Sequence, residues 1–224
     1  MKYKIVEKFV SINGEGPLMG QLAVFIRFKG CNLKCSYCDT MWANEENAKY
    51  ENMTSFEIYN YIKQTNIKNV TLTGGEPLIQ EGIFELLLVL AKDNSLNIEI
   101  ETNGSIDIKP FIEIKPKRPN FTIDYKSSIS NMENKMYKQN YEYLLITDCI
   151  KFVVGGLEEL EKSKIIIEKN NLINKCNVHL SPIFDNIKLA DIVNFMKKNK
   201  LNGIKVQPQL HKIIWNDRRE GNEE

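Results

Sequence analysis

The sequence has almost no excess of charge and no long apolar run. Its 30 basic residues are offset by 29 acidic ones, which leaves a formal net charge of +1. This balance provides no electrostatic footprint for nucleic acid or for an anionic membrane surface, so we expect a small-molecule substrate. No segment approaches the ~20 apolar residues that span a bilayer, and the N-terminal MKYKIVEKFV is unlike a secretory signal. We therefore expect a cytoplasmic protein.

Cysteine is scarce and odd in number, with five in the chain. Cytosolic thiols are kept reduced, so clustered cysteines indicate metal binding or catalysis more often than a disulfide framework. Cys149 and Cys176 stand apart at the starts of predicted strands, where a free cysteine is typically a small buried hydrophobe. We expect these two in the core. The other three are spaced C-x3-C-x2-C in CNLKCSYCDT, residues 31–40.

The chain also lacks internal repeats, low-complexity tracts and any Pro/Gly-rich linker that would mark a second domain. At 224 residues it can bury a sizeable core, and its 42% apolar and 26% charged residues are ordinary for a globular protein. We therefore expect a single domain over residues 1–224. Its charged end, 217–224, is expected to be a disordered tail.

Short β-rich segments alternate with helical patterns along most of the sequence. Apolar residues at helical spacing predict helices within 54–66, 81–94, 156–171 and 186–200, the first of them capped by Thr54. Apolar or β-branched runs bounded by Gly, Pro or Asn predict strands at 3–10, 22–28, 69–74, 97–102, 121–126, 149–154, 177–182 and 203–208.

This alternation predicts the fold class. Strand, helix and strand in repeated order require parallel strands with right-handed crossovers, because the helices must cover the faces of the sheet. About six such units fall short of the ~250 residues usual for eight. We therefore predict an α/β fold, a partial and open β/α barrel with about six core parallel strands.

The three clustered cysteines are one short of the usual ligand set. Electron carriers hold each cubane cluster by four cysteines, and structural zinc sites also fill four positions. Three thiolates would instead bind three corners of a cubane cluster and leave one iron free for a further ligand. A zinc knuckle that takes His179 or His211 as its fourth ligand remains an alternative. Position favours the cluster, because the cysteines follow the strand at 22–28 and α/β barrels build active sites at the carboxyl ends of strands.

The cysteine motif, with Tyr37 directly before Cys38, resembles the signature of the radical S-adenosylmethionine (SAM) superfamily. NVTLTGGEP, residues 69–77, resembles the GGEP motif of that superfamily, although GGEP alone could be a turn into a helix. The two motifs in this order make the resemblance specific. It implies a partial α/β barrel and a [4Fe-4S] cluster held by Cys31, Cys35 and Cys38, with SAM chelating the free iron.

A second resemblance reaches nearly from end to end. FVSINGEGPLMGQLAVFIRFKGCNLKCSYCDT, residues 9–40, is similar to the corresponding segment of the 7-carboxy-7-deazaguanine synthase family. ETNGS (101–105), SPIF (181–184) and QLHKIIW (209–215) resemble later landmarks of that family. The implied reaction is a radical ring contraction of 6-carboxy-5,6,7,8-tetrahydropterin to 7-carboxy-7-deazaguanine, with loss of ammonia.

The family resemblance also implies site residues. Arg27 would grip the substrate carboxylate with its guanidinium fork, and Thr40 would help to hold a Mg²⁺ that binds the same carboxylate. Each residue also has a purely structural interpretation: a strand-end salt bridge for Arg27, a solvated loop charge for Glu15 and a helix N-cap for Thr40. The implied substrate contacts are Ile12, Asn13, Gly14, Glu15, Arg27 and Thr73, and the implied SAM contacts are Tyr37, Cys38, Asp39, Gly74, Gly75, Glu76, Asp124, Lys126 and Ser181.

Three places depart from the family pattern. Asn13 stands where many members have Gln, and Asp124-Tyr125-Lys126 stands where many have Ser-Pro-Lys. Ser181-Pro182 replaces a frequent Gln-Pro. Lys126 retains the positive charge of the family's Lys, which could contact the carboxylate or ribose of SAM. Ser181 could contact the adenosine part of SAM.

The resemblance finally implies partners and rivals. A flavodoxin or ferredoxin would supply the electron, and the family commonly forms homodimers. The alternatives are a radical SAM activase that installs a glycyl radical on a partner enzyme, and a non-catalytic Fe–S or zinc module. The Gly-Glu-Gly segment at 14–16, Arg27 and the Cys-Asp-Thr at 38–40 argue against the activase.

Overall fold

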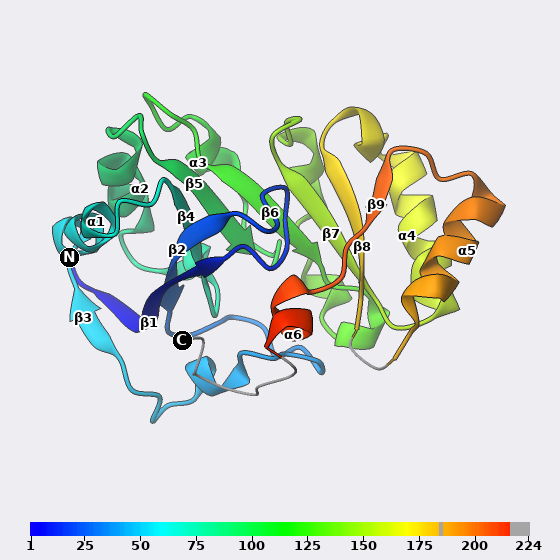
Figure 1. Cartoon of the computed structure of the whole chain (residues 1–224), viewed down its shortest axis with the longest axis horizontal. Helices are drawn as coiled ribbons and strands as arrows, with labels where there is room; N and C mark the ends of the chain where they lie inside the picture. Colours follow the sequence, from blue (N-terminus) through cyan, green and yellow to red (C-terminus); the bar gives the residue numbers. More distant parts are fainter. Residues whose placement is uncertain (184–185, 216–224) are drawn as a thin grey trace.

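The computed structural model describes residues 1–183 and 186–215 and forms an open sheet with helices around it (Figure 1). The expected disordered tail, 217–224, lies outside the described residues. The strands are β1 (Tyr3–Ile12), β2 (Leu22–Phe28), β3 (Glu51–Met53), β4 (Asn69–Gly74), β5 (Asn97–Thr102), β6 (Asn120–Tyr125), β7 (Cys149–Val154), β8 (Asn177–Pro182) and β9 (Ile204–Val206). The helices are α1 (Ser55–Gln64), α2 (Ile83–Ala91), α3 (Lys109–Ile112), α4 (Leu157–Lys169), α5 (Leu189–Asn199) and α6 (Leu210–Ile214).

The strands form a nine-stranded sheet in the order β3-β1-β2-β4-β5-β6-β7-β8-β9. Pairing is parallel from β2 through β9, which confirms the predicted parallel core. The two ends of the sheet, β3 and β9, are not neighbours in the described chain, so the barrel is open, as predicted.

The parallel arrangement does not extend to the first strand. β1 pairs antiparallel with β2 and also with the short β3. The connection at 13–21 is too short for a crossover, which takes a dozen or more residues, so β1 and β2 form a hairpin. This hairpin carries the Gly-Glu-Gly segment over the middle of the parallel core, where Glu15 reaches Lys151 of β7.

Each predicted helix is present. The N-terminus of α1 is a capping box, in which Thr54 Oγ1 accepts from the Glu57 amide at 3.2 Å and the Glu57 carboxylate accepts from the Thr54 amide at 2.7 Å. Ile58 and Ile62 on the next turns are fully buried in the core. None of the helices in the described ranges combines the length and the apolar character needed to cross a membrane.

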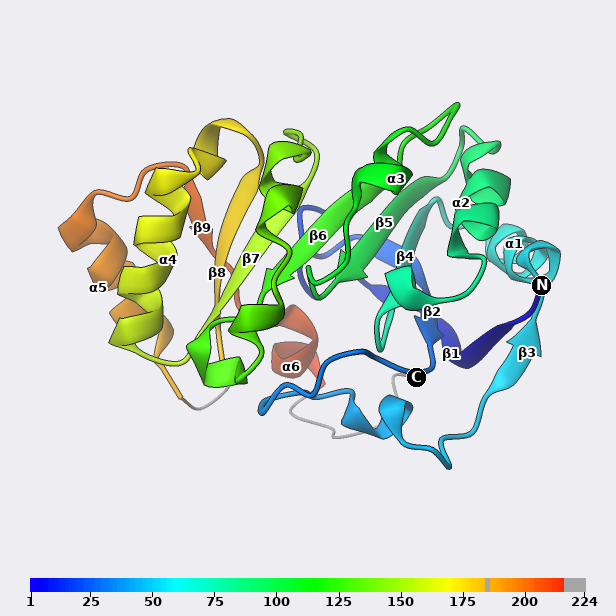
Figure 2. The same ribbon diagram turned by 180° about the vertical axis from the view of Figure 1, so that it is seen from behind.

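The two faces of the parallel sheet differ in chemistry because side chains alternate along a strand. One face carries apolar residues such as Leu72 and Ile100, which pack with the helices in one core. Figure 2 shows α2, α3 and α4 in front of this face, with α6 beyond the strands. The opposite face carries polar residues such as Thr73, Glu101 and Lys151, so it is suited to a polar ligand.

Candidate active site

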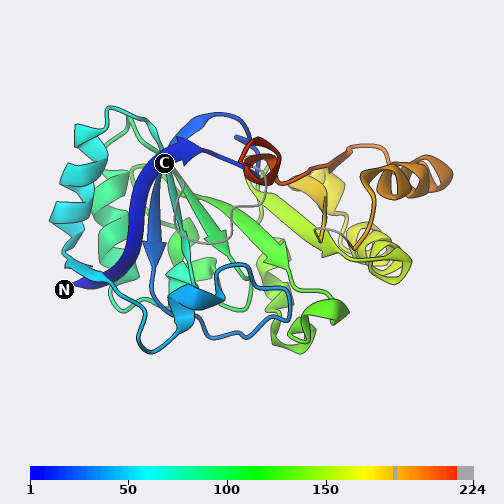
Figure 3. The same ribbon diagram turned by 60° about the horizontal axis from the view of Figure 1, so that its bottom comes forward.

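A cavity of about 970 Å³ opens over the polar face of the sheet. Its lining comes from the β1–β2 hairpin, the cysteine loop, the carboxyl ends of β4 to β8 and the C-terminal α6. The segment between β2 and β3, which holds the cysteines, runs along the edge of the sheet below these strand ends (Figure 3). The cavity therefore lies where active sites of α/β barrels are built.

All three clustered cysteines line this cavity and are partly exposed. The Cys31 sulfur accepts from the Leu33 amide and from Asn103 Nδ2, both at 3.4 Å. Burial raises the pKa of the Cys35 and Cys38 thiols. Cysteines are the ligands of iron–sulfur clusters, and binding such a cluster here would displace the protons of these thiols.

Within the described residues, no group of three or more His, Cys, Asp or Glu side chains is close enough to hold one metal ion. This finding does not support the zinc knuckle with His179 or His211. A cubane cluster binds each thiolate at a different iron, so its ligands surround a volume and need not converge on one point.

The GGEP turn packs directly against the start of the cysteine loop. The Gly75 amide donates to Phe28 O at 3.0 Å, and the Glu76 amide donates to Gly30 O at 2.9 Å. A Cβ at position 75 would lie only 1.8 Å from Gly30 O, so only glycine fits. The turn thus fixes the backbone one residue before Cys31.

Glu76 is not among the residues that line the cavity, and its implied contact with SAM stays a prediction. It is fully buried and accepts from the Leu78 amide at 3.0 Å, Thr102 Oγ1 at 2.8 Å and the Asn103 amide at 2.7 Å. Burial raises its pKa to about 7, and the hydrogen bonds oppose that rise. In this structure Glu76 joins the GGEP turn to the end of β5.

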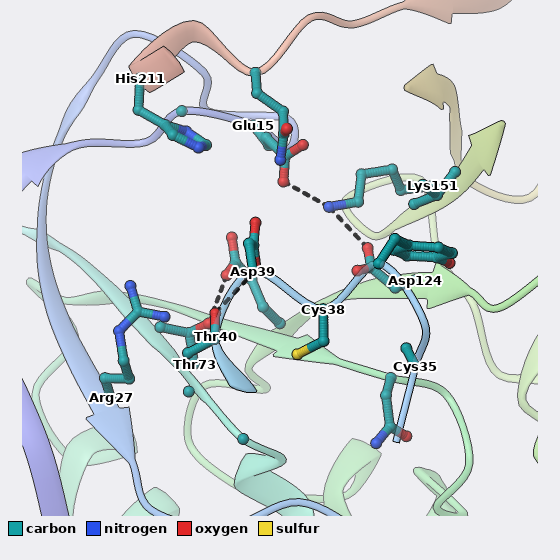
Figure 4. Close-up of a pocket in the computed structure, with 18 of the residues that line it drawn as sticks. Glu15, Arg27, Cys35, Cys38, Asp39, Thr40, Thr73, Asp124, Lys151 and His211 are labelled. Atoms are coloured by element: carbon teal, nitrogen blue, oxygen red, sulfur yellow. Dashed lines mark hydrogen bonds and ion pairs between the residues drawn. The ribbon is translucent and has the colours of Figure 1, made fainter. Parts of the chain in front are cut away.

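Four charged side chains of alternating sign cross one wall of the cavity, and Figure 4 shows three of them, Glu15, Lys151 and Asp124. Lys126 Nζ lies 3.0 Å from Asp124, Asp124 lies 2.9 Å from Lys151 Nζ, and Lys151 Nζ lies 2.6 Å from Glu15. Burial raises the pKa of Asp124, but Lys126 and Lys151 outweigh it and leave that pKa below its usual value. Glu15 is therefore a paired and largely buried charge, not a solvated loop residue.

The wall formed by β2 and β4 carries the residues expected at the substrate carboxylate. Arg27 is the register partner of Thr73, and both line the cavity. Arg27 Nε donates to Glu7 Oε2 at 2.8 Å. Arg27 therefore forms a salt bridge and also lines the cavity. Thr40 stands at the N-cap of a short 3-10 helix, but its hydroxyl does not cap the helix and instead donates to Asp39 Oδ1 at 3.0 Å.

Two hydroxyls, one on the cysteine loop and one on β8, make no hydrogen bond within the described residues. Tyr37 Oη and Ser181 Oγ are buried and make no hydrogen bond among the described residues, and both residues line the cavity. Buried hydroxyls without a partner are costly, which indicates that a ligand completes them. These positions are two of the implied SAM contacts.

Comparison with known proteins identifies the family. Residues 25–147 match the radical SAM superfamily. The 7-carboxy-7-deazaguanine synthase of Clostridium acetobutylicum is 56% identical over 99% of this chain and 100% of that protein. The chain belongs to the 7-carboxy-7-deazaguanine synthase family of radical SAM enzymes.

More distant members of this family support the assignment. The 7-carboxy-7-deazaguanine synthase of Chlorobaculum tepidum is 32% identical over 95% of this chain and 94% of that protein. The crystal structure of QueE from Escherichia coli superposes with a TM-score of 0.70 at 22% identity, covering 93% of this chain and 94% of that one. The crystal structure supports the open, mostly parallel α/β fold. Membership in the radical SAM family implies a [4Fe-4S] cluster and SAM.

Most of the implied family residues meet in the cavity. Asn13 is an exception, because its side chain accepts from Thr71 Oγ1 at 2.8 Å and its amide and carbonyl are used inside the hairpin. Asn13 thus shapes the loop, while its Nδ2 is buried without a hydrogen bond among the described residues, and its implied substrate contact stays a prediction. The implied residues that line the cavity are Ile12, Gly14, Glu15, Arg27, Cys31, Cys35, Tyr37, Cys38, Asp39, Thr40, Thr73, Gly74, Gly75, Asp124, Lys126 and Ser181.

Other cavity residues were not predicted. Lys151 is the central cation of the charged wall, and Glu101 accepts from Thr73 Oγ1 at 2.7 Å. Burial raises the pKa of Glu101. Charged residues inside the apolar strands CIKFVV and NIEIET were the available signal, because a charge amid buried neighbours needs a partner or a ligand. Asn103 and His211 also line the cavity, within the ETNGS and QLHKIIW landmarks.

Proposed function

We propose that this chain converts 6-carboxy-5,6,7,8-tetrahydropterin to 7-carboxy-7-deazaguanine by radical ring contraction with loss of ammonia. The observation that carries the proposal is the 56% identity to a 7-carboxy-7-deazaguanine synthase along the full length of both chains. The cavity supports it, because Arg27, Glu15 and the three cysteines of the loop line one space. The chain would act as a single domain in the cytoplasm, where thiols stay reduced.

The cysteine loop is suited to the cluster and its SAM. Cys31, Cys35 and Cys38 would hold three irons, and the partnerless hydroxyls of Tyr37 and Ser181 face the space left for SAM. The chemistry that the cluster and SAM supply when bound and reduced is hydrogen-atom abstraction from an unreactive C–H bond. The protein contributes binding, orientation and exclusion of water.

The opposite wall is suited to the pterin acid. Within the described residues, Arg27 makes its hydrogen bond through Nε. Its two terminal nitrogens could therefore bind a carboxylate as a bidentate fork. Thr40 would hold a Mg²⁺ that shares this carboxylate, since hard cations prefer oxygen ligands. Glu15, which pairs with Lys151 at 2.6 Å, would accept hydrogen bonds from the N–H edge of the pterin ring.

One incubation tests the proposal. Anaerobically reconstituted protein with SAM, Mg²⁺, a reductant and 6-carboxytetrahydropterin should yield 7-carboxy-7-deazaguanine and ammonia, detected by mass analysis. The Cys35→Ala variant should yield neither, and Cys149→Ala, which changes a core residue, should behave as wild type. Cleavage of SAM by wild type without any deazapurine product would refute the substrate assignment and favour the activase alternative.

A further inference from the structure

The Gly-Glu-Gly loop is held from behind by a side chain from the other end of the chain. The Gly16 amide donates to Gln207 Oε1 at 2.9 Å, and Gln207 Nε2 donates to Gly16 O at 2.8 Å. Gln207 thus pairs with both polar groups of one residue, as a neighbouring strand would. Only 4% of Gln207 is exposed, so water does not compete for these bonds.

A buried histidine fixes the orientation of this amide. His179 Nδ1 lies 2.9 Å from Gln207 Oε1, and His179 is fully buried. The oxygen carries no proton, so Nδ1 must be the donor and Nε2 the unprotonated nitrogen. Nε2 has no partner among the described residues, and burial lowers the pKa of His179, which agrees with the neutral form.

Position 16 tolerates only glycine here. Gly16 has a φ of +77°, which disfavours any residue with a side chain, and an added Cβ would lie 2.7 Å from Glu99 Oε1. The Glu99 side chain therefore occupies the space where a side chain at position 16 would begin, while Gln207 binds the Gly16 backbone. Neither Gln207 nor His179 lines the cavity.

The neighbouring residues show what this contact accomplishes. Glu15 reaches Lys151 at 2.6 Å, and the Leu210 amide at the start of α6 donates to Gly14 O at 3.0 Å. The side chain of Glu15 is thus directed by Lys151, while its backbone is held at Gly16. Removing the Gln207 contact would leave Gly16 with the weaker 3.3 Å bond from the Met19 amide and would loosen the Glu15 backbone on that side.

We propose that Gln207 and His179 are positioning residues that hold Gly16 so that Glu15 faces the substrate. The role of Glu15 toward the pterin rests on the proposed function, whereas the fixing of the loop does not. Loss of one or two buried hydrogen bonds, at ~1 kcal/mol each, corresponds to about a five- to thirtyfold change in an equilibrium constant.

Amide hydrogen exchange tests the fixing of the loop without any ligand. Gln207→Met keeps the length of the side chain and removes its hydrogen bonds, so peptides covering 13–21 should exchange about tenfold faster or more. His179→Leu, which keeps both Gly16 bonds and removes only the histidine donor, should give a smaller increase and serves if Gln207→Met fails to fold. Unchanged exchange in both variants would overturn the proposal.

Asn140 offers a matched control. Its buried side chain also bonds to backbone groups of a loop, accepting from the Ile108 amide at 3.0 Å and donating to Ile106 O at 2.8 Å. Asn140→Leu should speed exchange at 104–108 and leave 13–21 protected. Equal loss of protection at 13–21 in this control would mean that the effect is general destabilisation, which would also overturn the proposal.

Kinetics test the consequence for substrate. Gln207→Met should raise the KM for 6-carboxytetrahydropterin about tenfold or more, with SAM cleavage in the absence of pterin unchanged. If the loop loses protection but the KM stays the same, the positioning role is wrong. If wild type neither binds nor converts the pterin, the proposed function fails instead, and the exchange experiment still decides whether Gln207 fixes the loop.

Discussion

The Lys151 ammonium lies 2.6 Å from the Glu15 carboxylate, although the two residues are 136 positions apart in the chain. The side chains of both are nearly buried, with exposed fractions of 8% and 12%. Lys151 also contacts Asp124 at 2.9 Å, so one cation bridges two carboxylates at the cavity. The charges therefore depend on one another for their stability.

Lys151→Met should destabilise the protein by about 3–5 kcal/mol, because it leaves buried carboxylates without their cation. Adding Glu15→Gln should recover part of this loss, since it removes one of the unpaired charges. Denaturant unfolding measures both effects. Lys162→Met, which breaks a more exposed ion pair with Glu133, should cost much less. An equal cost for the two lysine variants would show that Lys151 carries no buried charge coupling.

Reconstituted protein should carry about four irons per chain, as one cubane cluster requires. Replacing Cys31, Cys35 or Cys38 by Ala should remove the cluster, as read from iron content and the electronic spectrum. Cys149→Ala and Cys176→Ala should retain it, because these thiols lie in the core with exposed fractions of 0% and 3%. Iron loss in the Cys176 variant would contradict its place in the core.

Thr40→Ala should weaken the stimulation of turnover by Mg²⁺ and leave the affinity for SAM nearly unchanged. The hydroxyl lines the cavity and does not cap the adjacent helix, so its removal should spare the local fold. Turnover is measured over a range of Mg²⁺ concentrations, with SAM binding measured separately. Weaker SAM binding with normal Mg²⁺ dependence would place Thr40 at the cofactor.

Arg27→Ala should greatly weaken substrate binding while the cluster and uncoupled SAM cleavage remain. Loss of the charged partner of a desolvated carboxylate costs about 2–5 kcal/mol, or roughly 30- to several-thousand-fold in affinity. Arg27→Lys should recover only part, since an ammonium lacks the bidentate fork. Titration with 6-carboxytetrahydropterin and with an analogue lacking the carboxylate checks this. Equal weakening of both ligands would mean that Arg27 does not read the carboxylate.

The stability of the protein should depend on pH through Glu99. Burial, with the nearby Glu101, raises its pKa from the ordinary 4.5 to about 7, so the folded state holds this proton more tightly than the unfolded chain. Its contribution to the free energy of unfolding is complete below pH 4.5 and is lost as the pH rises toward 7. Each unit of pKa difference is worth about 1.4 kcal/mol.

Glu99→Gln isolates this contribution, because the amide resembles the protonated acid and does not titrate. Denaturant unfolding of wild type and variant at several values between pH 5 and pH 8 gives the difference. Wild type should lose stability relative to Glu99→Gln as the pH rises. A difference that stays constant over this range would show that Glu99 does not bind a proton on folding.

The parallel core was predictable from the sequence because its apolar side chains recur at every second position, as Val70 and Leu72 do in β4. The short β3, Glu51–Met53, was not predicted, since its sequence is mostly polar and its strand form depends on pairing with β1. The antiparallel pairing of β1 with β2 was not predicted either. It depends on the short connection between the two strands, whereas the prediction used only the order of strand and helix patterns.

Some parts of the candidate site were predictable from the sequence and others were not. The cysteine loop and the GGEP turn were predictable because each is contiguous in sequence. The partners of Glu76 were not, because Thr102 and Asn103 reach it from the end of another strand. Likewise, Lys151 becomes a site residue only when β7 places it beside Glu15.

The contact between Gly75 and Gly30 constrains how such sequences can change over evolutionary time. Because a methyl group at position 75 would overlap the carbonyl at position 30, a change at one site requires a compensating backbone shift at the other. The GGEP turn and the cysteine loop are separate in sequence but form one structural unit.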